Sequence, residues 1–190
     1  MAERMKLYCR NFFRVIFVSG IIFLNCNLLA QPGTNDPNGY NKFFYENGKI
    51  SSEGPMREGK PDGYWKTYHQ NGKLKSEGNR VEFLLDSTWK FYNEQGKLSL
   101  EYTYKSGKKT GPVRTYNAEG QLLTEETYVS NTKHGLTVEY FPGGKTQKTI
   151  PFVEGREEGV GYEYDSLGAI ITITLYKAGL RLHKLGIIKI

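Results

Sequence analysis

A repeat of 24 residues constrains the fold of this chain more than any other feature. Glycine recurs at six equally spaced positions: Gly48, Gly72, Gly96, Gly120, Gly144 and Gly168. An aromatic residue precedes each glycine by four positions: Phe44, Tyr68, Tyr92, Tyr116, Tyr140 and Tyr164. Because no copy contains an insertion or a deletion, these residues have the same structural role in every copy. The chain is therefore predicted to fold as a tandem array.

Each copy predicts a β-hairpin. In the second copy, residues 64–68 (YWKTY) and 73–77 (KLKSE) are rich in residues that favour strands, and His-Gln-Asn-Gly at 69–72 connects them. The glycine of this connection can adopt a positive φ angle, as a hairpin turn requires. A second glycine-bounded turn leads to the next copy at 59–63, 107–111 and 155–159. No segment shows a convincing apolar period of 3.6 residues, so we expect essentially no helix.

The predicted fold class is all-β: an extended antiparallel meander of six tandem 24-residue β-hairpin repeats over residues 39–179, forming a single-layer twisted sheet of about twelve strands. One face should carry Tyr68, Leu74 and Tyr104, and the other Trp65, Trp89 and Val113. Terminal strands expose unpaired backbone groups. Residues 180–190, which break the repeat, are therefore expected to cap the last hairpin by adding a strand or by folding over the sheet.

The first 30 residues are typical of a signal peptide. Four basic residues lie within residues 1–14, and an apolar run follows up to Leu28, Leu29 and Ala30. We expect cleavage after Ala30, a short linker at 31–38, and export to the periplasm, the outer surface or the medium. A membrane anchor is the alternative, but Ser19, Gly20 and two asparagines interrupt the apolar run.

Both cysteines, Cys9 and Cys26, lie within this segment, so the mature chain is predicted to fold without disulfides. Processing as a lipoprotein at Cys26 stays an open alternative, although Phe23-Leu24-Asn25 lacks the small pair that such processing prefers. Removal of residues 1–30 would lower the formal net charge from +6 to +3, because four basic residues and one acid lie there. This charge does not call for nucleic acid or an anionic membrane as partner.

Two stretches carry a family resemblance: GYWKTYHQNGKLKSEG at 63–78 and YKSGKKTG at 104–111. They resemble the MORN-repeat variant of the bacterial YwqK-like group, which is labelled an antitoxin family, and the resemblance extends over about residues 39–179. It implies a hairpin-repeat sheet that binds proteins and, in some eukaryotic members, membrane lipids. The antitoxin label implies neutralising a toxin by direct contact. An exported protein would do this only for a toxin that acts outside the cytoplasm.

An active site needs a unique set of residues, whereas a residue present in every copy serves the repeat itself. The recurring acids Glu53, Glu77, Glu101 and Glu125 are therefore predicted to pair with basic residues on adjacent strands. The three histidines lie at different repeat positions, and no nucleophile or phosphate-binding motif is present. We expect no catalytic residue, no metal and no cofactor. Glycan hydrolysis is the one enzymatic alternative, because aromatic sheets bind sugars.

Aromatic density is the strongest positive signal for binding, with 14 Tyr and 2 Trp among 190 residues. The regular aromatic columns are predicted to hold the sheet together, so residues outside them are the candidate binding residues: Trp65, Trp89, Phe83, Leu84 and Leu85. The sequence thus predicts an exported, non-enzymatic scaffold, monomeric and antitoxin-like by resemblance, that binds an unidentified protein and no nucleic acid. The alternative is a peripheral module that binds a membrane surface through lysine and aromatic side chains.

Overall fold

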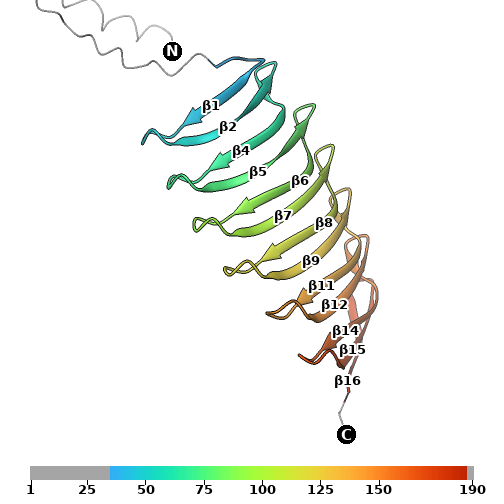
Figure 1. Ribbon diagram of the computed structural model, residues 1–190. Helices are drawn as coiled ribbons and strands as arrows, with labels where there is room; N and C mark the ends of the chain where they lie inside the picture. The colour runs from blue at the N-terminus through green and yellow to red at the C-terminus, as the bar shows by residue number, and fades with distance from the viewer. Residues whose placement is uncertain (1–34, 188–190) are drawn as a thin grey trace, which may run out of the picture. The chain divides into compact units, whose positions relative to one another are not determined.

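The computed structural model describes residues 35–187, which form the main part of one compact unit, Asn35–Ile190. All regular structure in these residues is β: sixteen strands lie in a single open antiparallel sheet. The predicted all-β class is confirmed, and so is the succession of hairpins (Figure 1). The predicted signal peptide, residues 1–30, lies outside the described residues.

Thirteen strands follow one another across the sheet in chain order. They are β1 (Tyr40–Phe44), β2 (Ile50–Arg57), β4 (Gly63–Tyr68), β5 (Leu74–Val81), β6 (Leu84–Tyr92), β7 (Leu98–Lys105), β8 (Lys108–Tyr116), β9 (Leu122–Val129), β11 (Gly135–Tyr140), β12 (Thr146–Val153), β14 (Gly159–Tyr164), β15 (Ile170–Lys177) and β16 (Leu180–Gly186). Three two-residue strands pair beside this path: β3 (Lys60–Pro61), β10 (Thr132–Lys133) and β13 (Arg156–Glu157).

The predicted number of about twelve strands is wrong. In three repeats the first strand is divided in two just before a glycine with a left-handed φ, namely Gly63 (96°), Gly135 (105°) and Gly159 (107°). The strand β16 adds one more at the end of the chain, where it pairs antiparallel with β15. Of the two arrangements expected for residues 180–190, the structure has the added strand over 180–186, and residues 188–190 lie outside the described residues.

Two kinds of turn alternate along the chain, at opposite ends of the hairpins (Figure 1). Wide turns connect the strands of one repeat. In the second repeat, Gly72 N donates to His69 O at 2.8 Å, and a β-bulge lies just before the turn, between Thr67 and Tyr68. Tight turns connect consecutive repeats through two residues, both with positive φ, such as Glu58 (53°) and Gly59 (72°). This is the turn geometry that matches the twist of antiparallel strands.

The small core lies on one face of the sheet, which we call the tryptophan face. Its central column contains one residue of each repeat, and all six are buried: Asn41, Trp65, Trp89, Val113, Thr137 and Gly161. The indole of Trp65 covers Gly54, and the indole of Trp89 covers Gly78, each in the preceding repeat. A side chain on either glycine would clash with the indole. Each indole N–H also donates to a carbonyl at 2.8 Å, Trp65 to Pro55 and Trp89 to Asn79.

The opposite face, which carries Tyr68, Tyr92 and Tyr116, is called the tyrosine face. Tyr104 was predicted to share it, and this prediction is wrong. Tyr102 pairs with Trp89, and Tyr104 follows two residues later with its ring 5.8 Å from that of Tyr102. Tyr104 thus lies on the tryptophan face. A β-bulge lies beside each wide turn. It reverses which face the side chains point to between the turn and the rest of the strand, so counting alternate residues across it predicts the wrong face.

Candidate binding surfaces

A ladder of tyrosines and glutamates covers the tyrosine face of the first four repeats. Each tyrosine hydroxyl donates to the glutamate of the preceding repeat: Tyr68 to Glu53 at 2.5 Å, Tyr92 to Glu77 at 2.7 Å and Tyr116 to Glu101 at 2.6 Å. Basic residues pair with these acids across the strands, as in Lys42–Glu53 at 3.3 Å and Arg114–Glu125 at 2.6 Å. The polar groups of this surface therefore satisfy one another.

The pKa values follow from this ladder. Burial, and then the hydrogen bond to Glu101, raise the pKa of Tyr116 to about 12. The hydroxyl of Tyr68, assisted by the ammonium of Lys42, lowers the pKa of the Glu53 carboxyl below its ordinary value. Both shifts favour the neutral phenol beside the ionised carboxylate. They describe a structural hydrogen bond and give no acid and base poised for catalysis at neutral pH.

The ladder ends at the fifth repeat. Thr149 and Ile173 occupy the glutamate positions, and Val138 and Tyr162 occupy the positions of the basic residues. Three neighbouring apolar residues are well exposed: Leu136 at 47%, Val160 at 41% and Leu175 at 43%. The strand register places these side chains on the tyrosine face. We call this set the apolar patch: Leu136, Val138, Val160, Tyr162, Ile173 and Leu175.

A shallow recess of about 590 Å³ opens over the apolar patch. Leu136, Val138, Tyr140, Thr149 and Tyr164 contribute to its lining. Among the described residues, the hydroxyls of Tyr140 and Tyr164 have no hydrogen-bond partner. Glu125, the acid that corresponds to Tyr140, binds Arg114 instead at 2.6 Å, and Thr149 occupies the position of the acid that corresponds to Tyr164. The recess thus combines apolar walls with two phenol groups free to bond with a ligand or a partner.

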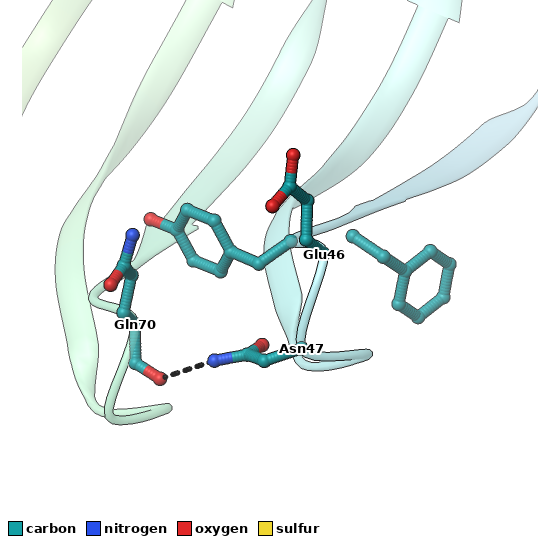
Figure 2. A pocket seen from close by; sticks show the side chains of 5 residues that line it. Glu46, Asn47 and Gln70 are labelled. Carbon is teal, nitrogen blue, oxygen red and sulfur yellow. Dashed lines mark hydrogen bonds between the residues drawn. The ribbon is translucent and has the colours of Figure 1, made fainter.

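A second recess, of about 560 Å³, lies between the first two wide turns. Figure 2 shows the side chain of Asn47 directed at the backbone carbonyl of Gln70, to which it donates at 3.3 Å. The next repeat has the same contact, from Asn71 to Glu94 O at 2.9 Å. His69 also spans this gap, with Nε2 2.8 Å from Tyr92 O, so Nε2 carries the proton. Because these contacts recur, the recess belongs to the packing of successive repeats.

The structure separates the predicted binding residues into two groups. Trp65 and Trp89 are 6% and 5% exposed in the core of the tryptophan face, which gives them a structural role. Whether they also contact a partner stays a prediction. Phe83, Leu84 and Leu85 lie together at the tight turn between the second and third repeats, and Leu84 is exposed there.

Phe83 occupies an unusual backbone position. Its φ angle is 67°, where the other five tight turns have glycine or asparagine. A bulky residue in this region is strained by about 1–2 kcal/mol. The ring lies 4.9 Å from the Arg57 guanidinium and 5.2 Å from the Lys60 ammonium of the preceding tight turn. Cation–π contacts offset part of the strain, so Phe83 packs on its neighbours and does not project freely.

The two rows of turns differ in chemistry. Residues that flank the tight turns are exposed and are mostly apolar or basic: Val81, Leu84, Val129, Val153 and Leu180 among the former, and Arg57, Lys60, Lys105, Lys108, Arg156 and Lys177 among the latter. The wide turns are mostly polar, with Phe141, Pro142 and Leu167 as the large apolar exceptions. The row of tight turns is therefore a second candidate surface, which we call the tight-turn row.

Sequence reasoning missed the apolar patch. The signal was present in the loss of glutamate at 149 and 173 together with the loss of lysine or arginine at 138 and 162. Within residues 35–187, no group of His, Cys, Asp and Glu side chains is arranged to hold a metal ion. The same residues contain no helix that is long and apolar enough to span a membrane.

Comparison with known families matches the repeats. Four consecutive segments, residues 37–58, 61–81, 85–106 and 109–130, each match the family described as MORN repeat variant. A search of curated proteins found no significant match. The assignment to the YwqK-like antitoxin group is not supported by the family match. The first four repeats are therefore similar to MORN repeats, which are generally protein- or membrane-interaction modules.

Proposed function

We propose that this protein is an exported, non-enzymatic repeat scaffold that binds another protein through the apolar patch. One observation carries the proposal: the ladder positions that form ion pairs in the first four repeats have no charged residue in the last two, and the exposed apolar residues Leu136, Val160 and Leu175 lie beside them. A soluble sheet face has no structural need for contiguous exposed apolar residues.

The surroundings of the patch favour a protein partner. Tyr140, Tyr162 and Tyr164 are half-buried aromatic residues on a regular sheet, the kind of residue that anchors protein interfaces. The ion pair between Arg114 and Glu125 borders the patch at the fourth repeat and supplies a polar rim. The strands fix these side chains in place, so little conformational freedom is lost on binding.

The test is affinity capture from the native envelope with the tagged chain. The double variant Leu136→Ser, Val160→Glu introduces polar groups into the patch. The matched control is Leu167→Ser, which changes a leucine 81% exposed in a wide turn outside the patch. The wild type and the control should capture the same protein, and the patch variant should lose it. Equal capture by all three chains would contradict the proposal.

A second candidate function is peripheral membrane binding through the tight-turn row, where exposed valine and leucine alternate with lysine and arginine. Basic residues beside apolar ones favour an anionic membrane surface. Co-sedimentation with anionic vesicles should be strong, should fall with added salt, and should weaken in Lys105→Glu, Lys108→Glu. Sedimentation that ignores salt and lipid charge would exclude this function.

Export is tested separately. Fractionation of cells that express the full chain should place it outside the cytoplasm, and N-terminal sequencing should begin at Gln31. A lipid on Cys26 would instead identify a lipoprotein. An antitoxin-like role rests on the family resemblance alone. It requires that the captured partner be toxic outside the cytoplasm and that addition of the scaffold suppress this toxicity.

A further inference from the structure

The last strand of the sheet, β16, has one side without a partner among the described residues. It pairs with β15 on its other side, and all seven of its residues, Leu180–Gly186, are exposed. Open edge strands present unpaired backbone N–H and C=O groups, to which another strand can add.

The hydrogen-bond pattern identifies the groups that point outward. Ile187 N donates to Ile171 O at 2.8 Å, across the pair β15 and β16. The register aligns Thr172 with Gly186 and Thr174 with Lys184. Because donors alternate along an antiparallel strand, Lys184 and Gly186 direct their N–H and C=O groups away from β15.

The side chains of β16 also alternate by chemistry. Arg181 and Lys184 pair with Tyr176 and Thr174, which places them on the tryptophan face. Leu185 pairs with Ile173 of the apolar patch, and it is exposed on the tyrosine face. The strand contains Arg181, His183 and Lys184 but no acidic residue. Lys184 forms an ion pair with Glu163 of β14 at 3.5 Å, whereas Arg181 has no ion-pair partner among the described residues.

We propose that β16 binds an extended peptide segment of the partner protein by strand addition. The segment alternates acidic residues, which face Arg181 and compete with Glu163 for Lys184, with apolar residues, which extend the apolar patch beyond Leu185. Backbone hydrogen bonds to Lys184 and Gly186 supply affinity, and the alternation supplies specificity. This proposal rests on the proposed function only in that the partner is a protein.

Charge selects this occupant over a second copy of the chain. Pairing two β16 strands would bring their basic side chains together, and like charges on neighbouring strands are unfavourable. An acidic segment has the complementary charge.

A substitution at Gly186 tests the proposal on the full chain. Gly186→Pro removes an outward N–H, and proline is tolerated on an edge strand where its nitrogen faces solvent. A Cβ at this position meets no atom within 4 Å. Gly186→Ala keeps the N–H and is the matched control. Equal melting temperatures for all three chains would establish that they are folded.

The probe is a fluorescent nine-residue peptide of alternating Glu and Val, with a Lys and Val peptide of the same length as comparison. In fluorescence anisotropy, the wild type and Gly186→Ala should bind the acidic peptide, and Gly186→Pro should bind it at least about tenfold more weakly. The basic peptide should bind no chain well. Amide exchange at Lys184 and Gly186 should slow only when the acidic peptide is present.

Three results would overturn the proposal: no binding up to about 1 mM peptide, equal binding by Gly186→Pro, or equal binding of the basic peptide. A wild-type dimer that Gly186→Pro abolishes would assign the edge to a second copy and would also overturn it. The proposed function fails separately, when the patch variant Leu136→Ser, Val160→Glu still captures the partner.

Discussion

The second and third repeats bury tryptophan on one face of the sheet, whereas the last two repeats expose apolar side chains on the other face. In the second and third repeats, Trp65 and Trp89 are buried on the tryptophan face, and ion pairs cover the tyrosine face. In the last two repeats, the central column of the tryptophan face has only Thr137 and Gly161, and the tyrosine face carries the apolar patch. The repeat thus fixes the backbone register and the turns, while the side chains on each face can differ from one repeat to the next.

The largest expected effect is a difference in stability between substitutions in the two regions. Trp89→Ala removes a buried indole and should lower the free energy of unfolding by about 3–5 kcal/mol. Leu136→Ala truncates an exposed side chain and should change it by less than about 0.5 kcal/mol. Urea denaturation followed by circular dichroism measures both. Similar losses would show that the apolar patch is part of the core, and the comparison would fail.

A smaller loss is expected when the space beneath the indole is filled. In Gly78→Ala the new Cβ would lie 2.3 Å from Cδ2 of Trp89, so ring or backbone must move. Such overpacking costs about 1–3 kcal/mol. The control Gly186→Ala meets no atom within 4 Å and should be neutral. In the Trp89→Ala background the Gly78→Ala penalty should disappear, and a penalty that persists would mean that the glycine serves some other purpose.

Deleting single hydroxyl groups sharpens the comparison further. Tyr116→Phe removes the hydrogen bond to Glu101 and should cost about 1 kcal/mol. Tyr140→Phe, one repeat later, removes a hydroxyl without a partner among the described residues and should cost less than about 0.5 kcal/mol. Thermal unfolding measures the loss of stability in each variant, and the two variants change equivalent tyrosines in consecutive repeats. The ladder would not end at the fifth repeat if the two losses were equal.

The smallest expected effect is a dependence on alkaline pH. The pKa values of Tyr116 and Tyr128 are raised to about 12 in the folded state, from an ordinary value of about 10. A raised folded pKa contributes stability that is complete below the unfolded value and is lost as pH rises through the folded value. Unfolding free energies should therefore fall between about pH 10 and pH 12. The fall should be shallower in Tyr116→Phe, and an unchanged slope would exclude Tyr116 as a source.

The fold could be predicted from the sequence because the same residues recur every 24 positions. Equal spacing from Gly48 to Gly168 fixes the turns, and the turns fix strand register. The face of Tyr104 was predicted wrongly because a bulge in each hairpin, at Tyr92 in the hairpin that contains Tyr104, reverses the alternation, and a bulge leaves no distinct mark in the sequence. The departure at Phe83 was visible, but its packing against Arg57 and Lys60 depends on two adjacent turns.

The candidate surfaces were harder to predict because each depends on what covers a side chain. Trp65 was proposed to bind a partner because it lies outside the regular aromatic column. Gly54 has no side chain, however, so the indole packs directly against its backbone and is buried. The apolar patch depends on substitutions in four strands, β11, β12, β14 and β15, that become contiguous only after the strands pair.

The hydrogen bonds between wide turns have a mechanical consequence. The contacts from Asn47 to Gln70 and from Asn71 to Glu94 each span 23 residues, one fewer than the length of a repeat, and so connect adjacent repeats. Lys145 reaches Ser166 over 21 residues in the same way. In these contacts each repeat holds its immediate neighbours, so tension applied at the two ends of the sheet should detach one hairpin at a time. Force spectroscopy would then record a regular sawtooth whose steps measure 24 residues of released chain.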